Sequence, residues 1–159
     1  MVAQPFLLDL GIWIEVKDGD LSCREPYRRH YSARHYRDGR DPCLFVGPGE
    51  KLVLLTRDAK AVFVWRRLLF SADGQTGINC ALFRNEGDQL LSDLIRLADE
   101  IAWSRWPGLR HYTYINPHKI RPSQHRYRNP RYPGRCFLKA GWEYCGSSKR
   151  GLYILERLP

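Results

Sequence analysis

A single change of hydrophobic period constrains the fold of this chain more than any other feature. Over Leu90–Trp106, apolar residues recur at spacings of three and four, which is the pattern of a helix with one buried face. The runs before and after it, Gly77–Arg84 and Arg110–Asn116, have strand composition, and Pro107 with Gly108 ends the helix. The sequence therefore predicts a β-α-β crossover, in which one helix joins two strands of the same sheet.

Shorter patterns predict the other elements. A turn-forming stretch between Lys51–Thr56 and Ala61–Arg67 indicates a hairpin of two strands. The remaining predictions are strands at Phe6–Val16 and Gly151–Leu158, a loop or a short helix plus loop over Ser22–Asp41, and a short helix over Gly134–Gly141. At 159 residues the chain fits one domain, 1–159. We expect an α/β fold of the α+β kind, with a central mixed, mainly antiparallel twisted sheet flanked by helices.

Charge and cysteine content narrow the functional class. The chain has 26 Lys and Arg against 17 Asp and Glu, a net charge of +9, which favours a polyanionic partner; the alternative is a basic surface that is simply solvated. We find no apolar run long enough for a membrane helix and no signal-like start, and expect a cytoplasmic protein without a membrane partner. The five cysteines lack CxxC spacing, and we expect reduced thiols. Four tryptophans are expected in the core: Trp65, Trp103, Trp106 and Trp142.

The strongest compositional signal is a Pro/Arg-rich segment at about 117–135, which reads as an insertion before the last helix. Arginines and histidines alternate there with Tyr127 and Tyr132, and prolines keep the segment extended. Such residues contact phosphates and stack on bases, so we predict a DNA-binding arm; the alternative is a mobile surface loop. The predicted nucleic-acid-binding residues are Arg28, Arg29, Arg34, Lys119, Arg121, Arg126, Arg128, Arg131 and Arg135.

A cluster of titratable and hydroxyl side chains after residue 29 is the first candidate for catalysis. His30, Tyr31 and Ser32 lie in a predicted loop, where catalytic residues often occur, and His35 and Tyr36 follow. The alternative is a polar loop that meets solvent or phosphate. The spacing of His30 and His35 matches no compact metal-binding pattern, so these two histidines are only weak metal candidates.

Two strand ends supply further candidates. Arg84, Asn85 and Gly87 lie where a strand meets the long helix, so backbone amides and side chains converge there on any bound cofactor; helix capping by Asn85 or by Glu86 is the alternative. Ser92, early in that helix, and Asn116, at the end of the next strand, are added as candidate catalytic residues. Asn116 is equally typical of a turn before a proline.

The half of the chain from Gly77 to Leu158 resembles the GNAT, or acetyltransferase-like, fold. The carriers are a strand, a turn "RNEGDQ" close to the pattern Arg/Gln-x-x-Gly-x-Gly/Ala, a helix, a strand, a helix ending in "KAGW" and a final strand. The resemblance implies a coenzyme A pyrophosphate on the amides of that turn. Arg84 and Gly87 match the pattern, but Gln89 occupies the last small position. The pyrophosphate motif for acetyl-CoA is therefore degenerate, and the sequence does not assign a cofactor.

A narrower resemblance is to the phage Mom family of GNAT-like DNA modification proteins. Its carriers are "RRHYSARHY", "FRNEG" followed by "LLSDLI", and "YTYINP" followed by "RCFLKAGW". It implies transfer of an acetamido-type or acyl-type group from a small-molecule donor to a base amine of DNA, with adenine N6 favoured, which protects phage DNA from restriction. Mom-like proteins tend to carry an Asp where this chain has Asn116, and a Tyr where it has Cys136 and Phe137.

Two other functions fit the same residues. An acetyl-CoA-dependent N-acetyltransferase would keep the fold and act on a small amine or a protein. A noncatalytic DNA-binding or antirestriction protein would keep the basic surface and lack the chemistry. The sequence predicts neither the donor nor the oligomeric state.

Overall fold

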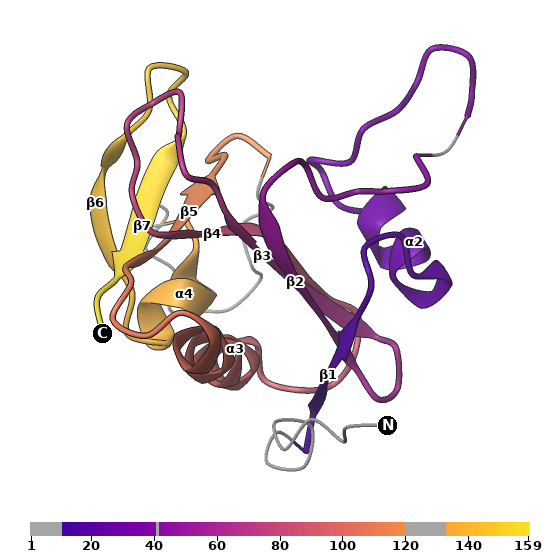
Figure 1. The fold of residues 1–159 in the computed structure, drawn as a ribbon, viewed down its shortest axis with the longest axis horizontal. Coiled ribbons are helices and arrows are strands. Elements are labelled where there is room, and N and C mark those ends of the chain that lie inside the picture. Colours follow the sequence, from indigo (N-terminus) through magenta and orange to yellow (C-terminus); the bar gives the residue numbers. More distant parts are fainter. Residues whose placement is uncertain (1–10, 41, 120–132) are drawn as a thin grey trace.

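Seven strands form one sheet in the computed structural model, which describes residues 11–40, 42–119 and 133–159. The sheet order is β1-β2-β3-β4-β5-β7-β6, and the pair β4–β5 is parallel while the other neighbours are antiparallel. The strands are β1 (Trp13–Val16), β2 (Glu50–Thr56), β3 (Ala61–Arg67), β4 (Ile78–Asn85), β5 (His111–Ile115), β6 (Glu143–Ser147) and β7 (Tyr153–Arg157). The described helices are α2 (Leu21–Arg28), α3 (Leu91–Arg105) and α4 (Arg135–Lys139) (Figure 1). The predicted α+β class with one mainly antiparallel sheet is confirmed.

The predicted crossover is confirmed as β4-α3-β5. Helix α3 begins and ends one residue inside the predicted Leu90–Trp106, and the two strands that it joins are parallel. Its apolar stripe, which includes Leu94, Ile95 and Ile101, is buried against the sheet. Asp93 in the first turn and Arg105 in the last turn carry the charges that the helix dipole favours at those ends.

The central strands are apolar on both faces because each face carries its own core. Leu52 and Leu54 of β2 point into the larger core with α3 and α4, whereas Val53 and Leu55 point into a second core with α2. Successive strand side chains alternate between faces, so an unbroken apolar run is what a sheet covered on both sides requires. Figure 1 shows α3 and α4 on one side of the sheet and α2 near β2. Trp65, Trp106 and Trp142 are buried as predicted, and Trp103 is partly buried.

Strands β4 and β5 stay paired only where they begin. Their register runs from Ile78 opposite His111 to Cys80 opposite Thr113, after which β4 continues to Asn85 beside β3 alone. One extra residue, Ala81, interrupts the β3–β4 ladder, because Val64 pairs with Leu82 and Trp65 pairs with Cys80. A bulge of this kind bends a strand and leaves one residue outside the ladder. The two parallel strands therefore diverge in the middle of the sheet.

The prediction of six strands was one short. Strand β6, "EYCGS", is mostly exposed at the sheet edge and contains a register shift before Gly146, so it carries none of the apolar alternation that predicts a strand. Pairing with β7 makes it a strand. Of the predicted strand Phe6–Val16, only Trp13–Val16 is a described strand, and residues 6–10 lie outside the described ranges. All five cysteines are free in the structure. Within the described ranges, no helix has the length and apolar character needed to span a bilayer.

Candidate functional site

Helix α2 holds the loop that follows it, residues 30–36 (the His30 loop), against the sheet. Asp20 caps the helix by accepting the Ser22 backbone N–H at 2.9 Å, and the apolar side of α2 is buried on β2 and β3. The hydroxyl of Tyr27, near the end of α2, accepts the backbone N–H of Arg34 in the loop at 2.9 Å. The loop that follows α2 is thus folded back onto the helix, which places His30 and Tyr31 over the sheet.

His30 is a neutral imidazole with a defined tautomer. Its Nδ1 lies 2.7 Å from the Ser32 hydroxyl and accepts the Ser32 backbone N–H at 3.2 Å, which places the ring proton on Nε2. Burial, and then the nearby positive charge of Arg84, lower the pKa of His30 to about 4. The ring stacks on Tyr31 with 4.4 Å between the ring centroids. At neutral pH His30 therefore offers an Nε2–H donor.

Tyr31, which is 40% exposed, lies near the Asn116 backbone at the end of β5. Burial raises the pKa of its hydroxyl, while hydrogen bonding to the Asn116 backbone at the end of β5 acts in the opposite direction. Cys80, in the last rung shared by β4 and β5, is a further electrostatic neighbour. The fold thus brings together the predicted catalytic residues His30, Tyr31 and Ser32 with the backbone of Asn116.

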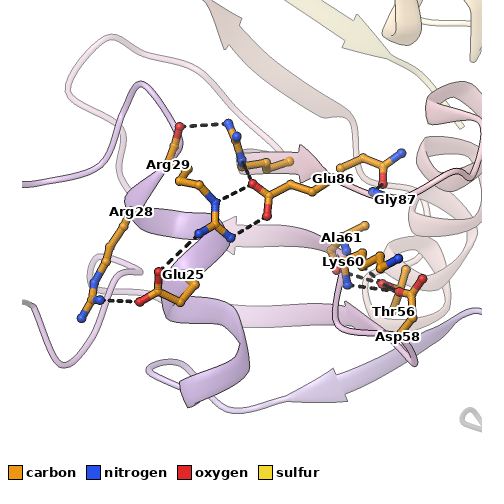
Figure 2. A network of polar contacts seen from close by, with 11 residues as sticks. Glu25, Arg28, Arg29, Thr56, Asp58, Lys60, Ala61, Glu86 and Gly87 are labelled. Atoms are coloured by element: carbon orange, nitrogen blue, oxygen red, sulfur yellow. Dashed lines mark hydrogen bonds and ion pairs between the residues drawn. The ribbon is translucent and has the colours of Figure 1, made fainter.

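An ion-pair network ties the end of α2 to the end of β4 (Figure 2). Arg29 donates to both carboxylate oxygens of Glu86, from Nε and from Nη2, at 2.6 Å each. Arg84 donates from Nε to the same carboxylate at 2.8 Å and from Nη1 to the backbone carbonyl of Arg29 at 2.9 Å. Hydrogen bonding from Arg29 lowers the pKa of Glu86 to about 2. Glu86 is therefore ionised, and its charge is balanced by the guanidinium groups of Arg29 and Arg84.

The turn between β4 and α3 does not fit a pyrophosphate. The amide of Glu86 donates to the Lys60 carbonyl at 2.8 Å, and the amide of Gly87 donates to Asn85 Oδ1 at 2.9 Å. Asn85 also donates from Nδ2 to the Gln89 carbonyl at 2.8 Å, so it closes the turn and does not cap α3, whose N-cap is Leu90. Two amides of the predicted coenzyme A cradle are thus already used within the chain.

A cavity of about 230 Å³ opens on the same face of the sheet as α2. Ser32 and Arg34 of the His30 loop line it together with Arg66 of β3, Asn79 of β4 and the bulge residue Ala81. Arg66 is held there by a 2.6 Å hydrogen bond from its Nε to the Pro48 carbonyl. No Asp or Glu belongs to the described lining of this cavity, and two arginines do. The cavity suits an anionic or electron-rich polar group.

The other predicted site residues lie apart from this cavity. Ser92 is buried in the first turn of α3. The Asn116 side chain accepts the His118 backbone N–H at 3.0 Å, which is the turn-forming role. Among the described residues, exposed His35 belongs to no group of three or more His, Cys, Asp or Glu that could hold a metal.

The predicted nucleic-acid-binding residues divide into three groups. Arg28 and Arg29 are bonded to Glu25, and Arg29 also to Glu86. Arg34 lines the cavity, and Lys119 and Arg135 are exposed on either side of the undescribed segment. Arg121, Arg126, Arg128 and Arg131 lie outside the described residues.

Sequence reasoning missed Arg66, Asn79 and Ala81. Arg66 ends an apolar strand pattern and looks like any solvent-facing strand end, and Ala81 carries no signal because a bulge depends on the pairing partner. It also missed a buried polar group behind the sheet, in which Asp99 Oδ1 lies 2.7 Å from His111 Nδ1 and Asp99 Oδ2 accepts the indole N–H of Trp142 at 2.9 Å. These three side chains are almost fully buried.

A scan against protein-family models and a search of curated proteins each found no match to this chain. The function of the site is therefore inferred from its residues and their geometry.

Proposed function

We propose that this chain is a GNAT-like DNA modification enzyme of the Mom type, which transfers an acetamido-type or acyl-type group from a small-molecule donor to a base amine of DNA, adenine N6 in the first place. The observation that carries the proposal is that His30 contacts both Tyr31 and Ser32, that Tyr31 lies near the Asn116 backbone, and that Ser32 lines a cavity whose described lining has two arginines and no Asp or Glu. The strand order, with one parallel pair that separates, supports the GNAT-like part.

The chemistry follows from the protonation states. A base amine attacks the electrophilic carbon of the donor, the bond from that carbon to the leaving group breaks, and the leaving group departs with the bonding electrons and takes up the proton that the amine loses. Negative charge develops on the leaving group before that proton reaches it. The neutral imidazole of His30 supplies an Nε2–H donor for that charge without first losing a proton. Arg34 and Arg66 hold an anionic part of the donor or of the target nucleotide in the cavity.

The turn between β4 and α3 argues against an ordinary acetyl-CoA enzyme. Its amides at Glu86 and Gly87 are bonded within the chain and so are already used. A donor without a pyrophosphate avoids this conflict. An attack on an amine inside the base stack also requires that the base leave the stack, which suits a basic protein with a pocket beside the reactive side chains.

The test is mass spectrometry of nucleosides from DNA of cells that express the protein. We expect an adenine adduct with the wild type, and a loss of about 100-fold or more with the double variant His30→Ala/Tyr31→Ala. The matched control is His35→Ala/Tyr36→Ala, because it removes the same two residue types, both residues are exposed in the same loop, and Tyr36 packs under Arg40. This control is expected to retain the adduct within about twofold.

Three outcomes contradict the proposal. A wild-type adduct level in His30→Ala/Tyr31→Ala removes the site assignment. DNA binding by the wild type without any adduct points to a noncatalytic DNA-binding protein. Tight binding of acetyl-CoA in isothermal titration, without a DNA adduct, points to the N-acetyltransferase alternative.

A further inference from the structure

Two consecutive apolar side chains stand in solvent on the connection between β3 and β4. Leu69 is 85% exposed and Phe70 is 91% exposed, the two highest values among the large apolar side chains that the structure describes as exposed. Neither side chain belongs to the two described cores. Adjacent large apolar side chains with this exposure are a candidate contact surface for a partner.

The connection that carries these residues is fixed to β5. Asp73 accepts hydrogen bonds from the hydroxyls of Ser71 and Tyr114 and from the Gln75 backbone N–H. Arg110 adds a bond from Nη1 to the Thr76 carbonyl at 2.9 Å. Leu69 and Phe70 therefore stand between the end of β3 and a segment bonded to β5, so their exposure is built into the fold.

The base of this connection is one end of the candidate cavity. Arg66 pairs with Asn79 in the β3–β4 ladder, and both residues line the cavity together with Ser32 and Arg34. Leu69 follows Arg66 by only three residues. Figure 1 shows the β3–β4 connection extending beyond the sheet at the end where the β6–β7 hairpin also extends, and residues 74–76 and 145–147 line a common hollow there. The apolar pair thus follows closely, along the chain, the strand end that carries Arg66 of the cavity.

We propose that Leu69 and Phe70 form a wedge that enters the base stack of duplex DNA when the target base is withdrawn; this rests on the proposed function. Apolar side chains that enter a base step unstack it and kink the duplex, and they are usually accompanied by basic residues that hold the backbone. The two arginines of the cavity and the net charge of +9 are complementary to a phosphate backbone. The wedge fills the space that an extruded base leaves.

The test compares binding with unstacking. Duplex oligonucleotides with 2-aminopurine at successive positions become more fluorescent where the stack opens. With the full chain we expect a rise of severalfold at one or two adjacent positions, and loss of this rise in Leu69→Ala/Phe70→Ala with DNA affinity retained within about threefold, because phosphate contacts dominate affinity. The adduct in cellular DNA is expected to fall by about tenfold or more, and Phe70→Trp is expected to retain both signals.

The control is Leu158→Ala, another exposed leucine, at the end of the chain beyond β7, and it is expected to behave as the wild type. A wild-type adduct level together with a wild-type fluorescence rise in Leu69→Ala/Phe70→Ala overturns the wedge and leaves the proposed function intact. Absence of DNA binding and of adduct in the wild type overturns both. Binding to vesicles of phosphatidylserine and phosphatidylcholine that is lost in this variant, while its effects on DNA are absent, overturns the wedge in favour of a membrane contact.

Discussion

The state of His30 depends on residues far from it in the sequence. Arg84 lies on β4, yet its charge acts on the imidazole of His30, and its guanidinium bonds to the carbonyl of the preceding residue, Arg29. Glu86 forms ion pairs with both arginines. Burial is the larger cause of the lowered pKa of His30, and the end of another strand adds to it through Arg84.

The titration of His30 tests this coupling. In the wild type we expect the ring to titrate near pH 4, and in Arg84→Gln at a higher pH that stays below the ordinary 6.5, because burial is the larger cause of the shift. The folded pKa lies below the unfolded value, so the contribution of His30 to stability is complete above about pH 6.5 and decreases as the pH falls toward 4. NMR of the ring ¹H–¹³C signals against pH measures this.

A remote arginine provides the comparison for that titration. Arg57→Gln removes an exposed guanidinium that bonds to the Gly11 carbonyl and is expected to leave the His30 titration unchanged. A wild-type pKa near 6.5, or equal values in wild type and Arg84→Gln, would show that burial and Arg84 do not set the state of this ring.

Helix α3 is joined to the second half of the sheet by one buried carboxylate. Asp99 contacts His111 of β5 and Trp142 of the turn before β6, and Arg157 of β7 lies 3.8 Å from its Oδ2. Trp103 stacks on the His111 ring with 4.5 Å between centroids. The long helix is therefore held by polar contacts as well as by its apolar stripe. These contacts also fix the start of β5, before it separates from β4.

Removal of this carboxylate is expected to weaken the whole fold. Asp99→Ala leaves the Trp142 indole N–H and the His111 ring buried without their partner, and we expect the free energy of unfolding to fall by about 3 kcal/mol or more. The matched control is Asp93→Ala on the same helix, which removes an exposed pair with Arg96 and is expected to cost less than about 1 kcal/mol. Urea unfolding followed by circular dichroism measures both. Equal losses in the two variants would contradict the structural role of Asp99.

Net charge acts at the scale of the whole molecule, and the fold selects which cations are exposed to a partner. Arg29 and Arg84 are committed to Glu86, whereas Arg34 and Lys119 are exposed near the site. Because each phosphate contact releases counterions, the slope of DNA affinity against salt concentration reports the number of phosphate contacts. The exposed pair is therefore expected to contribute more to this dependence than cations on the opposite side of the sheet.

The salt dependence of DNA binding measures that contribution. Plots of log affinity against log salt are expected to become shallower by about 2 in Arg34→Gln/Lys119→Gln. Arg96→Gln, an exposed arginine on α3 at the other face, is expected to leave the slope unchanged. A wild-type affinity that does not vary with salt would contradict phosphate binding, and an equal change of slope in the control would contradict the placement of DNA on the α2 face.

The sequence by itself determined the elements and their crossover, because these depend on local patterns. The period of three and four residues located α3, the apolar runs located β2, β3 and β4, and the order of strand, helix and strand determined the parallel pair. It also named the His30 loop as a candidate site from residue types alone. Strand β6 was not predicted, because an exposed edge strand needs no apolar alternation in its sequence.

The tertiary structure alone decided what those residues face. Packing of α2 on β2 and β3 brought His30 near Arg84, placed the Tyr31 hydroxyl near Asn116, and joined Glu86 to Arg29. The bulge at Ala81 and the separation of β4 from β5 follow from strand pairing, which links residues far apart in the chain. Such contacts have no local signature in the sequence, since their energy arises from burial and charge pairing that exist only after the strands and helices have packed together.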